Sequence, residues 1–178
     1  MKKILIVLCA ILLFTGCSCS MNDNKPDEAV ETFFEKYRSK DDDIITQLKE
    51  TIENEDLTDD EQEKYQELMK KQYDQFAYVI KDTNEEDDSA TVTVELTVLN
   101  YRSAILEAEE RLKSNPEEFN DDEGKFSEEK YMDYKIEKMS EVNDTTTHTI
   151  DLYLTKENGI WKVEQLSSDD ISKLHGLY

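Results

Sequence analysis

The sequence is poor in the residues that build common catalytic and metal sites. Its 178 residues include only three cysteines, two histidines and four glycines. The last cysteine is Cys19, so the chain beyond it has no disulfide framework, thiolate zinc site or cysteine nucleophile. Neither histidine belongs to a local zinc-binding or Ser-His-Asp pattern, and no glycine-rich phosphate loop is present. These absences argue against the familiar metal, nucleophilic and nucleotide-binding chemistries, and no cofactor is expected.

Positive charge is also scarce. The chain has 21 Lys plus Arg against 43 Asp plus Glu, a formal net charge of -22 at pH 7. Nucleic-acid binding requires clustered Lys and Arg beside the phosphates, and docking on anionic lipid requires basic clusters as well. The composition argues against both kinds of partner. An acidic surface instead attracts basic peptides or proteins, which are the partners we expect.

Residues 1–16 have the pattern of an export signal. Two lysines follow Met1, and residues 4–14 form an apolar run that is shorter than the roughly 20 residues needed to span a bilayer. Thr15, Gly16 and Cys17 come next. This ending resembles the lipobox of bacterial lipoproteins. The resemblance implies that Cys17 is diacylated on its sulfur and becomes the first residue after cleavage, and two acyl chains suffice for stable anchoring.

The leader leaves two other interpretations open: an ordinary secretory peptide with an incidental cysteine, and an uncleaved signal anchor. Cys19 fits the modified position less well, because Gly16 stands three residues before it. The expected organisation is a signal peptide over residues 1–16, a lipidated cysteine and tether over 17–26, and a single domain over 27–178. The protein is then anchored by lipid on the extracytoplasmic face of the cell membrane.

Apolar residues at spacings of three and four predict three helices in the first part of the domain. Asp27 is the expected N-cap of the first helix, whose apolar stripe runs from Ala29 to Tyr37. A second helix is predicted over residues 42–53. Thr58 and Glu61 have the spacing of a capping box and open a third helix, which extends to about Phe76. Further helices are predicted over residues 103–114 and 127–141, separated by an acidic loop over 116–126.

A period of two predicts the strands. Residues 78–80 begin one strand, the acidic residues 85–88 make a turn, and residues 90–98 alternate between apolar and polar. Near the end, Asn158 and Gly159 supply the positive φ angles of a type I′ turn. A two-residue turn there places Leu154 opposite Val163 and Lys156 opposite Trp161.

A short last helix follows, with Ser168 as its cap and Gly176 as its stop. The element order predicts an α+β fold, with an antiparallel sheet of about four strands packed on one face by helices.

Aromatic residues and one histidine are the candidate ligand-binding groups. The side chains that can line a cavity are Tyr37, Tyr101, Tyr131, Tyr134, His148 and Trp161. The competing interpretation is that the aromatic residues form core stripes and that His148 is a partly exposed residue at a strand end on the core face. His175 stands near the end of the last helix, where its imidazolium can interact with helix carbonyls. The acidic clusters fail the EF-hand spacing, so no metal site is expected.

Two segments resemble nuclear transport factor 2-like (cystatin-like) domains. Residues 158–163, with the order Asn-Gly-Ile-Trp-Lys-Val, are similar to the closing hairpin of that family, and residues 29–40 are similar to its first helix. Many small Gram-positive lipoproteins combine a lipobox with such a domain. The family includes isomerases, dehydratases and non-catalytic binding domains.

Three functions follow as hypotheses. The first is a surface-anchored, non-enzymatic domain that binds a small ligand or a protein. The second is a small enzyme that uses His148 or a tyrosine with a carboxylate in a cone-shaped pocket. The third is a structural or immunity-type envelope protein.

Overall fold

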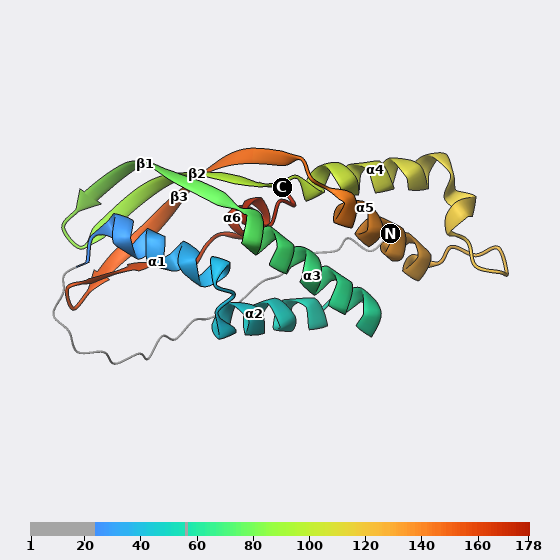
Figure 1. The fold of residues 1–178 in the computed structure, drawn as a ribbon, viewed down its shortest axis with the longest axis horizontal. Coiled ribbons are helices and arrows are strands. Elements are labelled where there is room, and N and C mark those ends of the chain that lie inside the picture. The colour runs from blue at the N-terminus through green and yellow to red at the C-terminus, as the bar shows by residue number, and fades with distance from the viewer. Residues whose placement is uncertain (1–23, 56) are drawn as a thin grey trace.

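The computed structural model describes residues 24–55 and 57–178. The leader and Cys17 lie outside this range. In chain order the elements are α1 (Pro26–Arg38), α2 (Asp42–Glu53), α3 (Asp59–Gln75), β1 (Ala77–Glu86), β2 (Ser89–Leu99), α4 (Tyr101–Ser114), the 3-10 helix η1 (Pro116–Phe119), α5 (Glu128–Glu141), β3 (Thr145–Glu157), β4 (Ile160–Val163) and α6 (Ser168–Leu174). The strands form one antiparallel sheet in the order β1-β2-β3-β4. The predicted α+β class and four-stranded sheet are confirmed (Figure 1).

One face of the sheet is buried, as the alternating sequence of β2 requires. The inward residues of β2 and β3 share the core with Phe34 of α1 and Leu174 of α6. Asn158 and Gly159 both have positive φ angles, at 53° and 82°, and the predicted pairs Leu154–Val163 and Lys156–Trp161 are both present. The turn therefore fixes the register of the last hairpin.

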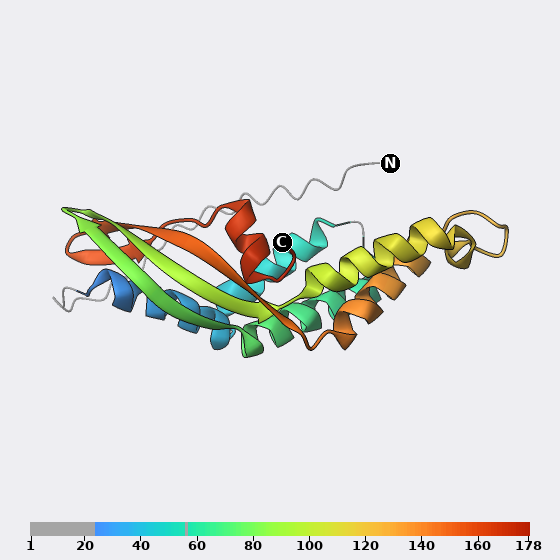
Figure 2. The same cartoon turned by 90° about the horizontal axis from the view of Figure 1, so that it is seen from above.

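A second core lies among the helices. It joins apolar residues of α2 and α3 to the first turn of α4 and the last turns of α5, including Leu68, Tyr101 and Met139. Because α4 and α5 are inserted between β2 and β3, they extend the molecule along its long axis, away from the sheet (Figures 1 and 2). The molecule is elongated, with the sheet at one end and the α4–α5 hairpin at the other.

Gln72 ties the two cores together. Its side chain is fully buried; its amide nitrogen donates to the Leu174 carbonyl at 3.1 Å, and its oxygen accepts from the Leu99 amide at 2.9 Å. One side chain therefore connects α3, the end of β2 and the end of α6. A buried polar group is stable only when its hydrogen bonds are made, and both are made here.

Several local features differ from the sequence-based expectation. Strand β1 includes Glu85 and Glu86, which were expected in the turn, and α4 begins at Tyr101, two residues before the expected start. Helix α1 begins at Pro26 with Lys25 as N-cap, since proline is favoured at the first helical position; Asp27 instead accepts a hydrogen bond from Thr83 at 2.5 Å. Ser167, rather than Ser168, caps α6. The acidic loop contains η1, which buries Phe119. The Thr58–Glu61 capping box is confirmed.

Candidate functional site

The aromatic residues expected to line one cavity lie in separate surroundings. Tyr101 is fully buried in the helical core, where its hydroxyl donates to the Leu68 carbonyl at 2.9 Å. Trp161 is buried in the sheet core. Tyr131 and Tyr134 of α5 pack against Phe119, each with a ring-centroid distance of 5.4 Å. Tyr37 of α1 contacts Tyr73. The structure uses these rings as packing groups and does not gather them around a common ligand.

His148 lies on the helix-covered face of β3, directly opposite Leu96, as strand parity predicts. It is partly exposed and packs edge-on against Tyr178, with a ring-centroid distance of 5.8 Å. Its Nε2 atom is buried without a hydrogen-bond partner. Desolvation and the positive charge of Lys173 lower the pKa of His148, so the ring is held in its neutral form.

The sequence-based prediction that the His175 ring is protonated is wrong. The ring does not act as an imidazolium beside helix carbonyls, because desolvation lowers its pKa to about 4. Its Nε2 atom lies 3.0 Å from the Tyr73 hydroxyl, a contact that joins α6 to α3. Burial raises the pKa of Tyr73, so the hydroxyl keeps its proton and can donate it to the neutral imidazole. His175 therefore serves packing between elements.

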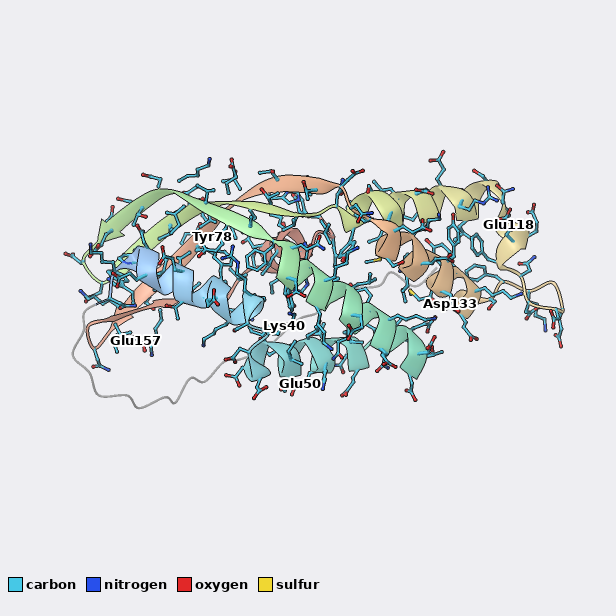
Figure 3. All side chains as sticks on the ribbon, in the orientation of Figure 1. Lys40, Glu50, Tyr78, Glu118, Asp133 and Glu157 are labelled. Atoms are coloured by element: carbon cyan, nitrogen blue, oxygen red, sulfur yellow. The ribbon has the colours of Figure 1, made fainter. Side chains whose placement is uncertain are left out.

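The helical half has a recess on its surface, a groove between α3 and α5 with a volume of about 860 Å³. Figure 3 labels Asp133, on the α5 wall. The residues that line the groove are Asp60, Glu63, Lys64, Glu67, Leu68, Lys71, Asp133, Ile136, Glu137 and Ser140. Buried Leu68 and Ile136 form its apolar floor. Five carboxylates and two ammonium groups make the lining net negative. We name this surface the α3–α5 groove.

Both lysines of the groove are engaged by the protein itself. The Lys64 ammonium bridges the walls, with its Nζ 2.5 Å from Asp60 and 2.9 Å from Asp133. Hydrogen bonds from Lys64 to these two carboxylates raise the pKa of Lys64. The Lys71 ammonium donates to the carbonyls of Ser140 and Val142 at 3.1 and 3.0 Å, at the C-terminal end of α5. A cation at a helix C-terminus is favoured by the helix dipole.

The remaining three carboxylates of the groove are exposed, and two of them have no ion pair among the described residues. Glu67 pairs with Lys70 at 2.8 Å on the exposed surface. Glu63 and Glu137 are exposed and form no ion pair within the described part of the chain. Glu63 and Glu67 are four residues apart on α3, as are Asp133 and Glu137 on α5, so each pair lies on one helix face. The groove thus has two facing acidic rows.

Two acidic clusters outside the groove act within the fold. Asp41 caps α2 by accepting from the Asp43 amide at 3.1 Å, and Asp121 accepts from the amides of Glu123 and Lys125. Within residues 24–55 and 57–178, no group of three or more His, Cys, Asp or Glu side chains is placed to hold a metal ion. Among the same residues, none of the helices is long and apolar enough to cross a bilayer.

Comparisons of the chain with protein-family models, with curated proteins and with solved structures found no match. The features of the chain that bear on its function are the leader, the fold and the α3–α5 groove. The groove was not among the sites expected from the sequence, where no acidic residue of α3 or α5 was a candidate binding residue. The available signal was the four-residue spacing of acids in both helices, but the sequence does not show that these two faces meet.

Proposed function

We propose that this protein is a lipoprotein, held on the extracytoplasmic face of the cell membrane by acyl chains on Cys17, and that its domain binds a basic protein or peptide without catalysing a reaction. The anchoring part of the proposal rests on the apolar leader and on the order Thr15, Gly16, Cys17. The binding part rests on the α3–α5 groove. Its carboxylates exceed its ammonium groups, and both ammonium groups already have partners.

We propose a nuclear transport factor 2-like architecture for the domain. The sheet order β1-β2-β3-β4, the packing of α1 on the covered face and the Trp161-containing closing strand support it. The α4–α5 hairpin is then an insertion between the second and third strands. A fold of this kind does not itself decide between catalysis and binding, so the function has to be argued from the groove.

The catalytic alternative requires a carboxylate or a tyrosine hydroxyl within hydrogen-bond reach of His148. In the described part of the chain, the His148 ring packs against Tyr178 and lies near the charge of Lys173, and its Nε2 has no hydrogen-bond partner. Tyr101, Tyr131 and Tyr134 all belong to the helical half of the molecule. These placements favour a binding role.

Membrane fractionation tests the anchoring. The wild-type protein should remain with the membranes in high salt and be released by detergent, since its acyl chains lie in the bilayer. Cys17→Ser should block acylation and the cleavage that follows it, leaving an unlipidated precursor of higher mass. Cys19→Ser is the matched control and should behave as the wild type. A wild-type protein without lipid, or acylation that survives Cys17→Ser, would refute the proposal.

A further inference from the structure

We propose that the α3–α5 groove receives its partner as a Lys- and Arg-rich amphipathic helix. This inference rests on the proposed binding function and specifies the partner's chemistry and docking mode. An amphipathic helix docks by laying one face into a groove, and its contacts recur at spacings of three and four residues. The groove offers that geometry, because its walls are two helices whose acidic residues repeat every four residues.

Lys64 shows what the groove recognises. Its ammonium group lies between Asp60 on α3 and Asp133 on α5 and is bound by both. Lys64 thus makes the kind of contact that we expect from a partner's lysine. The partner's lysine would bind one or two helical turns farther along the groove. At those turns stand Glu67 and Glu137, one on each wall. A basic residue placed between them repeats the contact that Lys64 makes.

The floor of the groove offers little exposed apolar surface to a partner. Leu68 and Ile136 are only 5% and 3% exposed, so the floor offers a narrow apolar strip. A docked helix needs a narrow apolar stripe flanked by basic residues. Charge then supplies most of the recognition, which predicts fast association and an affinity that falls steeply as salt rises.

A peptide titration tests the inference. The probe is a synthetic helix of about 18 residues, or about five turns, with a leucine stripe flanked by lysines. A peptide of the same composition in scrambled order lacks the stripe. Binding is measured at low salt to the full lipidated protein on phosphatidylcholine vesicles, and vesicles without protein give the background. The wild type should bind the amphipathic probe more tightly than the scrambled one; equal affinities would overturn the helical part of the inference.

Two charge-matched variants locate the site. Glu63→Gln, Glu67→Gln and Glu137→Gln together remove three exposed charges from the groove and should weaken probe binding roughly tenfold, since exposed charge pairs contribute modestly and add. The control removes three charges from the tip of the β1–β2 hairpin, where every residue from Glu85 to Asp88 is exposed, by Glu85→Gln, Glu86→Gln and Asp88→Asn. It should change the affinity less than about twofold.

These measurements distinguish a failure of the helix-docking inference from a failure of the proposed binding function. If both triple variants weaken binding equally, the acidic surface as a whole attracts basic partners, and the groove is not the docking site. That result overturns this inference and leaves the binding function standing. If the wild type binds neither peptide at low salt, the basic partner is wrong in both proposals. A circular dichroism spectrum like that of the wild type shows that each variant is folded.

Discussion

Gly176 lies where the end of α6 meets the end of β2. Its φ angle is 71°, and a Cβ atom there would lie 2.0 Å from the Leu99 carbonyl oxygen and 3.0 Å from Nε2 of Gln72. Its carbonyl accepts from the Arg102 amide at 2.8 Å, so the backbone has little room to shift. Glycine is required here for its positive φ and for the close approach of two backbones.

Gly176→Ala should therefore be strongly destabilising. We expect a loss of more than about 3 kcal/mol in the free energy of unfolding, because an overlap with backbone adds to the cost of about 1–2 kcal/mol for a left-handed non-glycine residue. The control is Gly124→Ala, which has a φ of 77° but no atom within 4 Å of the new Cβ. It should lose only about 1 kcal/mol. Urea unfolding measures both, and equal losses would contradict the packing of α6 on β2.

His175 should make stability depend on pH. Its pKa is about 4 in the folded protein and near 6.5 when unfolded, so between these values the unfolded chain binds more protons. The contribution of His175 to the free energy of unfolding is fully present above about pH 6.5. It is lost as the pH falls towards 4, which lowers the free energy of unfolding by up to about 3 kcal/mol. His175→Gln removes the titrating ring and should flatten the curve of unfolding free energy against pH over this range. Parallel curves for the two proteins would disprove the assignment.

At the scale of elements, the buried ring of Phe119 packs inside the tip of the α4–α5 hairpin. Phe119 is 4% exposed and packs between Tyr131 and Tyr134, whereas Phe126, a few residues along the same loop, is 52% exposed. The two phenylalanines therefore offer a matched comparison of the same side chain in buried and exposed positions. The tip lies far from the sheet, so its opening should leave the sheet intact (Figure 2).

Phe119→Ala should loosen this hairpin locally. Removing a buried phenylalanine costs about 3 kcal/mol, and here the loss should appear as faster amide hydrogen exchange near residues 111–135. Exchange in β2 and β3 should stay unchanged. Phe126→Ala should have a smaller effect on both regions, since this side chain is already 52% exposed. Faster exchange throughout the sheet after Phe119→Ala would show that the two cores unfold as one unit.

The strands and their register are predictable from the sequence because the signals are local. Asn158 and Gly159 determine a two-residue turn, and that turn determines which residues face each other on β3 and β4. The same holds for the capping box of Thr58 and Glu61, in which each residue binds the backbone of the other. Errors at the caps of α1 and α6 amount to one or two residues and arise where Pro26 or a neighbouring serine competes for the same role.

The groove is not predictable in this way, because it depends on which faces of two helices meet. Glu67 and Glu137 are 70 residues apart in the chain, and nothing local indicates that they line the same recess. In the described part of the chain, the candidate aromatic residues are divided between separate clusters for a related reason. Side chains such as Tyr101 and Trp161 share a residue type but pack into different cores. Residue type alone does not determine a common site.

At the scale of the whole molecule, the chain enters the fold at the sheet end. The Asn24 side chain pairs with β4, accepting from the Trp161 amide at 2.8 Å and donating to its carbonyl at 3.3 Å. Cys17 precedes Asn24 by seven residues, which span at most about 25 Å. The proposed acylation of Cys17 would therefore keep the sheet end near the bilayer. Glu157 lies at this end and Glu118 near the opposite one, as Figure 3 shows.

This geometry predicts the orientation of the anchored protein, with its sheet end near the membrane and its α4–α5 end away from it. In a Cys19→Ser background, a fluorophore attached through Glu157→Cys should be quenched strongly by an acceptor dye in the vesicle surface. The same fluorophore attached through Glu123→Cys, in the loop between η1 and α5, should be quenched weakly because that loop lies at the far end (Figure 1). Equal quenching at both positions would mean that the long axis lies along the membrane.

The most direct test of the account is to map where a basic helix contacts the protein. The amphipathic lysine–leucine probe, carrying a photoreactive group, is irradiated with the lipidated protein on vesicles at low salt, and the adducts are located by mass spectrometry. If the partner docks in the groove, adducts should lie within residues 59–75 and 128–141, the two helices that form the α3–α5 groove. They should disappear when salt screens the charges. Adducts concentrated at the β1–β2 turn, or spread evenly over the acidic surface, would contradict docking in the groove.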